Sequence, residues 1–293
     1  VFFDSKGNLL FILVYLISAK KSSSKIKLTN YKAICKILTV MSIFHAIILG
    51  IVEGVLEFLP VSAAGNLTLV GKLLGIPSSD FIKIYEIVMQ LGAVFAVLIL
   101  YAKRLLVDIK TLKKVIYAFI PTGILGLIVY KPVKHYLLYN DKITVISLII
   151  GGIIIIAVEL SKKKPTIYKI DDLSTKKAIL LGFIQALAFI PGVSRSGATI
   201  VGGILLGMDR KTSVEFSFLL AIPTILSAGS YALLKDHAQI SHSDFLAMGV
   251  SFVTALIFAI ISVKTFLRFI STNNLMAFGF YRIIVGIAYL VFA

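Results

Sequence analysis

Two carboxylates lie four residues apart in an apolar stretch of the chain, at Glu53 and Glu57 of the segment EGVLEFLPVSAAGN, residues 53–66. Residues with this spacing share one face of a helix, so the two side chains are neighbours. Inside a membrane an ionised pair needs a cation or an arginine, whereas a pair that shares one proton could act as general acid and base. A pair that only solvates a water-filled mouth is the alternative.

A second polar cluster, PGVSRSGAT at residues 191–199, has the composition of an anion site. It would open a short helix, whose free backbone N–H groups and positive end attract anions. Ser194, Ser196 and Thr199 could add hydroxyl donors, and Arg195 a planar fork suited to phosphate. An ordinary helix start, with the arginine bonded to carbonyl groups, is the alternative. Carboxylates and a phosphate cradle together predict a phosphorylated, membrane-embedded substrate such as a lipid pyrophosphate.

The elements that must position these residues are membrane helices. The chain is 58% hydrophobic and 15% charged, with a mean hydropathy of +0.99. Soluble domains are less apolar and more charged, and several runs approach the roughly 20 apolar residues that cross a bilayer. We therefore expect an all-α polytopic membrane protein. Its net charge of +16 fits loops that orient membrane helices, so no nucleic-acid partner is expected.

The apolar segments fall into long and short classes. We interpret six of them as transmembrane helices, near 81–101, 115–130, 143–160, 213–233, 243–264 and 275–292. Shorter pieces beside Gly/Pro/Ser clusters form two expected hairpins, 42–75 and 177–206. Short, broken segments in matching positions of two halves suggest re-entrant helical hairpins in an inverted-topology repeat.

The two halves, roughly 41–160 and 177–293, can be aligned with an offset of 132 residues. The offset pairs Ala46 with Ala178, Gly50 with Gly182, Glu53 with Gln185, Val61 with Val193, Ser62 with Ser194 and Gly65 with Gly197. Because small and polar residues are among the pairs, shared hydrophobicity does not fully explain them. Chance similarity between two apolar stretches is the alternative.

Positive charge predicts the orientation of the helices. The expected loops on one side, 101–114, 161–177, 207–212 and 264–274, carry 15 Lys and Arg residues, against 6 on the other side. The richer side is cytoplasmic by the positive-inside rule. The first hairpin then enters from outside and the second from the cytoplasm, so that their tips meet inside the bilayer.

Residues 1–40 do not fit this orientation, because they place seven lysines on the outer side. Met41 stands just before the first amphipathic segment. We interpret 1–40 as a non-native or disordered basic extension and 41–293 as a single integral membrane domain. A basic arm that lies on anionic lipid is the alternative.

Four further charged residues lie within or at the ends of the expected spans: Glu86, Glu159, Glu215 and Arg282. Structural ion pairs or helix-end positions account for each of them at least as well as catalysis does. No metal site built from histidine is expected, since His45 is the only histidine near the first hairpin.

At the two polar clusters the sequence resembles the undecaprenyl-diphosphate phosphatase family, also called bacitracin-resistance proteins. The family motif E-G-x-x-E-F-L-P-V-S-S-T-G-H aligns with residues 53–66 without gaps, and P-G-x-S-R-S-G-A-T is matched in full at 191–199. The resemblance covers about 41–293. Further similar stretches lie at 89–97, 120–126, 215–224 and 278–286.

This resemblance implies a two-hairpin inverted repeat in the bacterial cytoplasmic membrane, with an active site toward the outer face. The implied activity is hydrolysis of undecaprenyl diphosphate to undecaprenyl phosphate and inorganic phosphate, which recycles the lipid carrier for cell-wall synthesis. The implied partners are a polyprenyl diphosphate lipid and the membrane. A homo-oligomer is one of the states that the sequence allows.

The resemblance also assigns roles to residues. Glu53, Glu57, Ser62 and Arg195 would be catalytic, and Glu53 and Glu57 would bind a divalent cation, Mg²⁺ or Ca²⁺. Substrate contacts would come from Ser194, Arg195, Ser196, Gly197, Thr199, Gly65 and Asn66.

The chain departs from the family where the chemistry is assigned. The family's Ser-Ser-Thr-Gly-His reads Ser62-Ala63-Ala64-Gly65-Asn66 here. The second serine and the histidine are the usual nucleophile and proton-transfer group, and neither alanine nor asparagine can replace them. Three outcomes fit: Ser62 attacks instead, Glu53 or Glu57 activates a water, or the chain is a non-hydrolytic lipid-phosphate binder or translocase.

Overall fold

The computed structural model describes residues 42–76, 80–137, 141–161, 163–236 and 245–292. The predicted basic extension at 1–40 lies outside these residues. The regular elements of the described part are helices, and one isolated bridge joins Ile167 to Met208. The prediction of an all-α protein is therefore confirmed.

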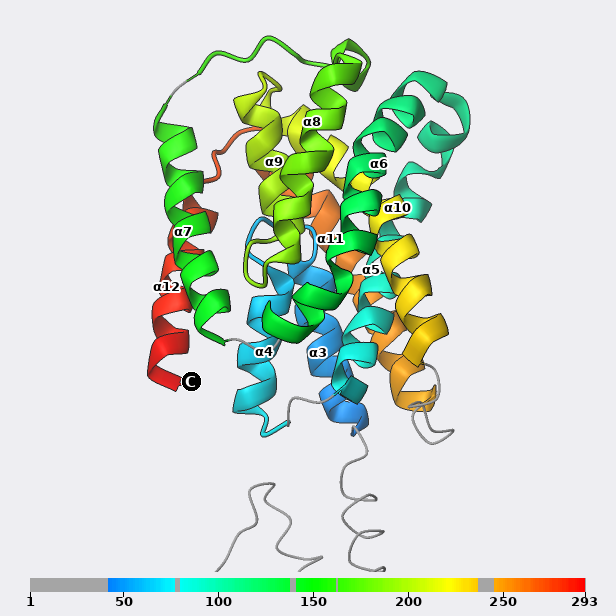
Figure 1. Ribbon diagram of the computed structural model, residues 1–293, viewed down its shortest axis with the longest axis vertical. Coiled ribbons are helices and arrows are strands. Elements are labelled where there is room, and N and C mark those ends of the chain that lie inside the picture. The colour runs from blue at the N-terminus through cyan, green and yellow to red at the C-terminus, as the bar shows by residue number, and fades with distance from the viewer. Residues whose placement is uncertain (1–41, 77–79, 138–140, 162, 237–244, 293) are drawn as a thin grey trace, which may run out of the picture.

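Ten α-helices of the described part follow one another along the chain (Figure 1). They are α3 (Ile43–Leu56), α4 (Ala63–Leu73), α5 (Asp80–Val107), α6 (Ile109–Pro132), α7 (Asp141–Leu160), α8 (Thr175–Ala186), α9 (Arg195–Leu205), α10 (Arg210–Asp236), α11 (Phe245–Ile270) and α12 (Met276–Phe292). A π-helical turn at Val133–Leu137 and 3₁₀ turns at Ile170–Asp172 and Leu187–Phe189 complete them. Among the described residues, α5, α6, α7, α10 and α11 are long and apolar enough to cross a membrane, whereas α3 and α12 are shorter apolar helices.

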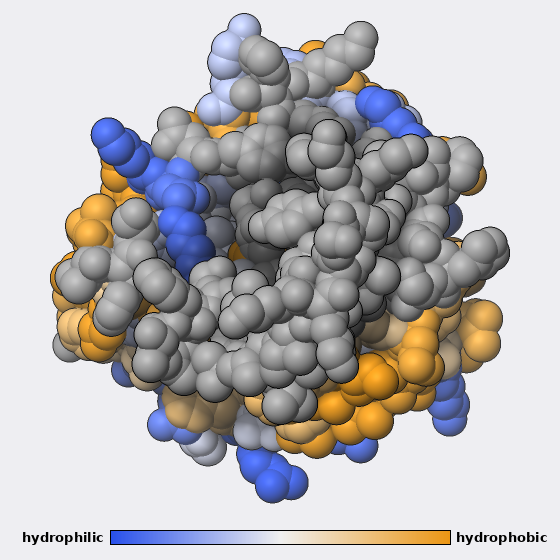
Figure 2. Space-filling view, turned by 90° about the horizontal axis from the view of Figure 1, so that it is seen from below, coloured by the Kyte–Doolittle hydropathy of each residue, from blue (hydrophilic) through white to orange (hydrophobic). Residues whose placement is uncertain are grey.

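Apolar side chains cover much of the outside of the helix bundle. Ile99, Leu127, Ile150 and Ile257, on four different helices, are each at least half exposed. The end-on view shows hydrophobic residues, in orange, around the sides of the molecule (Figure 2). Soluble monomers rarely expose so much apolar surface. The chain is therefore a multi-pass membrane protein whose sides contact lipid.

The long helices extend beyond the apolar runs that predicted them. The expected loop at 101–114 is wrong, since α5 continues to Val107 and α6 begins at Ile109. Lys and Arg are good helix formers, so a helix continues through its charged turns after the apolar residues end. Asp108 alone separates the two helices, and its Oδ1 accepts a hydrogen bond from the Thr111 N–H at 2.9 Å, which caps α6.

The short helices of the two halves have matching boundaries. Under the offset of 132 residues, α8 begins where α3 does, and α9 has the same first and last residues as α4. Ser42 and Ser174 cap α3 and α8 in the same way, each accepting from the N–H three residues later. Figure 1 shows α3 and α4 in the lower half of the molecule and α8 and α9 in the upper half, with their connecting loops near the middle.

Both connecting loops end in the same unusual turn. Ser62 and Ser194 are the non-glycine residues with positive φ in the described part of the chain, at 66° and 73°. The offset of 132 pairs them with each other. A left-handed conformation costs a non-glycine residue about 1–3 kcal/mol. The surrounding contacts must therefore hold both turns in place.

Glycine allows each short helix to lie against a long one. A Cβ at Gly182 of α8 would lie 2.0 Å from the Ala118 carbonyl oxygen of α6. At the paired position in α3, a Cβ on Gly50 would lie 2.8 Å from the Ser251 carbonyl oxygen of α11. Small residues at crossings bring membrane helices into backbone contact. These crossings fix the two loops relative to the rest of the bundle.

Candidate active site

Glu57 and Arg195, predicted from separate motifs, form an ion pair where the two loops meet. Arg195 Nη2 lies 3.0 Å from Glu57 Oε1, and the two side chains are only 12% and 10% exposed. Arg195 Nη1 donates to the Ser217 carbonyl oxygen at 3.0 Å, and the guanidinium carbon lies 5.6 Å from the centre of the Phe58 ring. The fold therefore brings together the charged groups of the two sequence motifs.

Glu53 lies one helical turn before Glu57 on α3 and is completely buried. Neither of its carboxylate oxygens accepts a hydrogen bond from an N–H or hydroxyl group of the described residues, and the one carboxylate close enough to share a proton with it is Glu57. Such a carboxylate is costly to bury unless it is protonated or meets a cation. Glu57 is thus committed to Arg195, whereas Glu53 has free capacity to accept a proton or bind a cation.

A divalent cation fits Glu53 only if the substrate supplies further ligands. Within the described ranges, no group of three or more His, Cys, Asp and Glu residues could hold a metal ion. Mg²⁺ is, however, commonly bound by one or two carboxylates together with water and substrate phosphates. The unpartnered oxygens of Glu53 fit this mode, and the predicted cation stays a prediction.

Ser62 is buried in the left-handed turn that begins α4. Its hydroxyl makes no capping hydrogen bond to the helix. The equivalent Ser194 does, because its Oγ accepts from the Gly197 N–H at 3.0 Å. Strained turns before a helix also present the nucleophilic serine of α/β-hydrolases. Because the Ser62 hydroxyl caps no helix, it is the hydroxyl of this turn that could act as a nucleophile.

Asn66, which stands at the family's histidine position, is held at both ends of its amide. Its Nδ2 donates to the carbonyl oxygens of Val61 at 3.1 Å and Ser62 at 2.9 Å. Its Oδ1 accepts from the Tyr281 hydroxyl at 2.6 Å. Asn66 thus stabilises the loop before α4. Nothing in the sequence marks Tyr281 as a site residue except its place in the family-like stretch at 278–286.

The hydroxyls of the second motif bond within the protein. Ser196 Oγ lies 3.1 Å from Ser194 Oγ and donates to the Leu59 carbonyl oxygen of the other loop at 2.7 Å. Thr199 Oγ1 lies 2.9 Å from the Arg195 carbonyl oxygen and 2.6 Å from Ser217 Oγ. These bonds shape the loop around the guanidinium. The expected contacts of these hydroxyls with phosphate stay predictions.

Gly65 and Gly197 occupy equivalent places in the first turns of α4 and α9. A Cβ at Gly65 would lie 3.3 Å from Leu148 Cδ1, and one at Gly197 would lie 3.3 Å from Arg282 Nη1. Both glycines therefore allow the start of a short helix to lie close to neighbouring side chains. Their expected contact with the substrate also stays a prediction.

Arg282 forms neither of the arrangements expected for it, an ion pair or a helix-end position. It lies inside α12, is 1% exposed and donates only to backbone carbonyl oxygens. The acceptors are Leu148 (3.2 Å from Nε), Pro60 and Val193 (3.3 and 3.0 Å from Nη1), and Ser147 and Gly192 (3.0 and 2.8 Å from Nη2). Three of these five carbonyl groups belong to the two loops. No periodicity or motif predicts such a set of acceptors.

The other three charged residues do form ion pairs, as expected. Glu86 pairs with Lys83, Glu159 with Arg210 and Glu215 with Arg104. The Glu159 carboxylate also accepts from the Leu275 N–H at 3.0 Å, which ties α7 to the start of α12. The Glu159–Arg210 and Glu215–Arg104 pairs join different helices, the Lys83–Glu86 pair lies within α5, and all three lie outside the two loops.

Known proteins similar to this chain identify its family. The family model described as bacitracin resistance protein BacA matches residues 46–288, and this range contains both loops and all candidate site residues. The chain belongs to the BacA family. The resemblance drawn from the two motifs is therefore confirmed.

Relatives within the BacA family match nearly their full length. The undecaprenyl-diphosphatase of Aquifex aeolicus is 46% identical over 253 residues, which cover 86% of this chain and 99% of the relative. That of Persephonella marina is 49% identical over 255 residues, with coverage of 86% and 99%. That of Wolinella succinogenes is 51% identical over 254 residues, with coverage of 86% and 98%.

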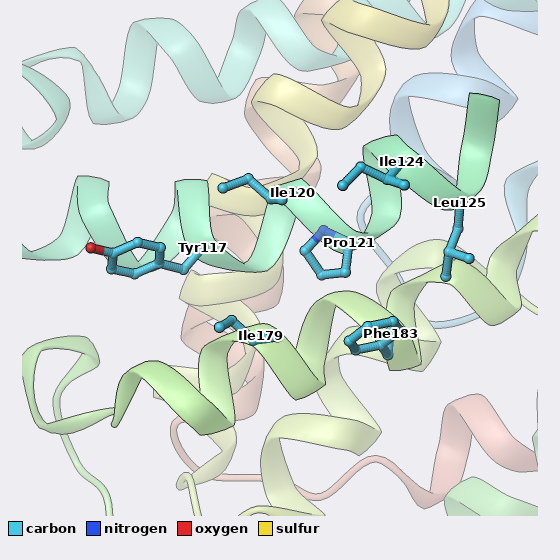
Figure 3. A pocket seen from close by; sticks show the side chains of 7 residues that line it. All are labelled: Tyr117, Ile120, Pro121, Ile124, Leu125, Ile179 and Phe183. Atoms are coloured by element: carbon cyan, nitrogen blue, oxygen red, sulfur yellow. The ribbon is translucent and has the colours of Figure 1, made fainter. Parts of the chain in front are cut away.

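A hollow of about 270 Å³ between α6 and α8 lies apart from the charged groups of this BacA-family chain (Figure 3). It is lined by Tyr117, Ile120, Pro121, Ile124, Leu125, Ile179 and Phe183. None of these residues can bind a phosphate through a charge. The candidate active site is therefore the meeting point of the two loops and not this apolar hollow.

Proposed function

We propose that this chain hydrolyses undecaprenyl diphosphate to undecaprenyl phosphate and inorganic phosphate. Relatives with 46% to 51% identity carry the name undecaprenyl-diphosphatase. The observation that carries the proposal is the buried Glu57–Arg195 pair with the unpartnered Glu53 beside it. A guanidinium binds phosphate oxygens, and a carboxylate with free oxygens can accept a proton or hold a cation. Hydrolysis of a diphosphate requires both functions.

We further propose six membrane spans, α5, α6, α7, α10, α11 and α12, and two re-entrant hairpins, α3–α4 and α8–α9, in an inverted-topology repeat. Three features support this topology: the matched helix boundaries, the paired strained serines and the opposed halves seen in Figure 1. The excess of Lys and Arg favours a cytoplasmic location for the upper ends of the helices in that view. The α3–α4 hairpin then enters from outside, and the site faces the outer leaflet.

In the proposed reaction, Arg195 binds the diphosphate through the N–H groups that Glu57 and Ser217 leave free. A nucleophile attacks the terminal phosphorus, and its proton passes to the Glu53 carboxylate. The bond between that phosphorus and the bridging oxygen breaks, and its electron pair leaves with undecaprenyl phosphate. Glu53 and the oxygen of Glu57 that accepts no bond from Arg195 would hold the divalent cation, and when bound it would neutralise phosphate charge.

The absence of a histidine at position 66 is tolerable for this leaving group. A phosphate monoester has a second pKa near 6, so it can depart near neutral pH without being fully protonated. The absence of a hydroxyl at Ala63 affects the attacking group instead. Ser62 Oγ, which makes no capping bond, and a water activated by Glu53 are the two nucleophiles that fit the site. Attack by water forms inorganic phosphate directly. Attack by Ser62 forms a phosphoserine, and a water must then attack its phosphorus and return a proton to Oγ before inorganic phosphate is released.

A non-hydrolytic lipid-phosphate binder or translocase is the second candidate function. The Asn66 amide favours it, because its hydrogen bonds to Val61, Ser62 and Tyr281 hold the loop and an amide cannot exchange a proton near neutral pH. Binding or transfer of the lipid between leaflets without phosphate release would identify this function.

The deciding experiment measures phosphate release from C15 and C55 prenyl diphosphates in detergent, with divalent cation and with EDTA. We expect the chain to release phosphate and Glu53→Gln to lose at least about 100-fold in kcat, the usual range for a general base. Asp171→Asn is the control: this exposed carboxylate lies in the 3₁₀ turn Ile170–Asp172, and its hydrogen bond from the Thr111 hydroxyl can be kept by the asparagine amide oxygen. If the chain binds the lipid without turnover while the triple variant Ala63→Ser, Ala64→Thr, Asn66→His releases phosphate, the non-hydrolytic function replaces this proposal.

A further inference from the structure

The guanidinium of Arg282 lies between the two loops and uses every donor that it has. An arginine offers five N–H groups in a rigid plane. Its partners are five different carbonyl oxygens, two from α7 and three from the loops. Hydrogen bonds from a charged donor are stronger than those between neutral groups. One side chain of α12 therefore joins three parts of the chain that are far apart in sequence.

The loop carbonyl groups that Arg282 holds lie directly before the two strained serines. Pro60 precedes Ser62 by two residues, and Gly192 and Val193 immediately precede Ser194. Ser194 is in turn adjacent to Arg195. A shift of the guanidinium would therefore move the turn that carries Ser62 relative to the turn that carries the proposed diphosphate-binding arginine.

Glycines make the space for this guanidinium. A Cβ at Gly151 of α7 would lie 2.1 Å from Arg282 Nη2, and one at Gly197 would lie 3.3 Å from Nη1. The ion pairs of the described residues do not include Arg282. The planar guanidinium is thus surrounded by backbone carbonyl groups. Hydrogen bonds to these groups hold it in place without a carboxylate partner.

We propose that Arg282 is a positioning residue of the active site: its planar fork locks the two loops together and so sets the distance between Ser62 and the Glu57–Arg195 pair. The proposal rests on the proposed hydrolysis for its kinetic consequence but not for its structural one. Lysine cannot take over this role, because its donors radiate from a single nitrogen and cannot span five carbonyl groups. Arg282 itself needs no contact with substrate.

The structural test measures the separation of the loops directly. Nitroxide labels on cysteines introduced at the exposed Ala64 and Ile190 report that separation through dipolar broadening of the EPR spectrum, in a chain whose single Cys35 is replaced by serine. We expect one narrow distribution in the parent chain and a broader or longer one in Arg282→Lys. Gly151→Ala, whose methyl group would displace the guanidinium, should have the same effect without changing Arg282. Arg268→Lys, an exposed arginine on α11, is the matched control.

The kinetic test asks whether positioning matters for turnover. We expect kcat of Arg282→Lys and Gly151→Ala to fall about 100-fold with little change in KM, because displacement of reacting groups by about 1 Å has such an effect. Methylguanidinium added to Arg282→Gly should restore part of the lost kcat, a response that general destabilisation would not give. Unchanged label distances in both variants overturn the proposal whether or not the chain hydrolyses substrate. Separated loops with undiminished kcat overturn it as well.

Discussion

The Glu57–Arg195 pair predicts a specific pattern of stability in a double-mutant cycle. Glu57→Gln keeps a hydrogen-bond acceptor beside Arg195 but removes the negative charge. Arg195→Gln keeps a hydrogen-bond donor beside Glu57 but removes the positive charge. Removing one member of a fully buried pair costs about 3–5 kcal/mol, because the other charge is left uncompensated. Here the side chains keep 10–12% exposure, and Arg195 keeps its bond to the Ser217 carbonyl oxygen. We therefore expect about 1–3 kcal/mol for each single variant.

The double variant Glu57→Gln, Arg195→Gln leaves neither charge of the pair without its partner, so its cost should fall below the sum of the two single costs by about 2 kcal/mol. The chain has no tryptophan, so unfolding in SDS–detergent mixtures is best followed by pulse proteolysis. The matched control is the Lys83–Glu86 pair, whose side chains are 25% and 16% exposed one helical turn apart. Its coupling should stay near 0.2–0.5 kcal/mol, roughly the value for helical pairs.

The same pair predicts a kinetic effect on hydrolysis. Misplacement of Arg195 in Glu57→Gln by the equivalent of 2 kcal/mol should reduce kcat/KM about 30-fold. Most of the reduction should appear in KM, because Arg195 binds the diphosphate before as well as during the reaction. Single-variant costs that add to within about 0.5 kcal/mol would refute the ion pair itself. A normal KM in Glu57→Gln would refute the assignment of Glu57 as the residue that orients Arg195.

Three further predictions concern single positions. Ser62→Gly should raise the free energy of unfolding by about 1 kcal/mol, because glycine tolerates the positive φ. Ser194→Gly should raise it less, because this variant loses a capping bond, and denaturant titration compares the two. If Ser62→Gly still releases phosphate, water and not Ser62 is the nucleophile. Gly182→Ala should lower the free energy of unfolding by about 1–3 kcal/mol, because the new methyl group meets the Ala118 carbonyl oxygen. Gly249→Ala, where a Cβ meets nothing, should raise it by about 0.5–1 kcal/mol. A Gly182→Ala variant more stable than Gly249→Ala would contradict the α6–α8 crossing. Burial alone would raise the pKa of Asp108, but hydrogen bonds from Thr111 and the charge of Arg104 lower it overall. The ionised Asp108 carboxylate therefore stabilises the fold fully above its unfolded pKa of about 3.9, and this stabilisation decreases as the pH falls from there through the folded pKa. In thermal melts, Asp108→Asn should keep the helix cap and lose this acid dependence.

Patterns of residue type were enough to predict the helices and the charged groups of the site. Apolar runs located the long helices, and the glycine–proline clusters located the loops between the short ones. The sequence predicts that Glu57 and Arg195 lie near one another, because they stand on two hairpins that enter from opposite sides and whose tips meet inside the bilayer. The structure confirms that these two side chains meet.

Contacts made through the backbone could not be predicted in this way. The acceptors of Arg282 are carbonyl groups, which every residue possesses, so no residue type marks them in the sequence. The partner of Asn66, Tyr281, lies more than 200 positions later and is recognisable only once α12 is placed. The charged residues at 101–114 do not mark a loop, because charge marks only the end of the apolar part of a helix and both helices continue through it.

The repeat relation has a consequence for the number of sites in each chain. The offset of 132 residues places Gln185 opposite Glu53, Phe189 opposite Glu57 and Ala63 opposite Arg195. Each half therefore carries the charge that the other half lacks, although their backbones match. If both halves had kept both the carboxylates and the arginine, the repeat would contain two equivalent sites that face each other. Divergence at these three pairs would leave the proposed site asymmetric, with its acidic residues from the first half and its arginine from the second, so a bound diphosphate would have one favourable direction.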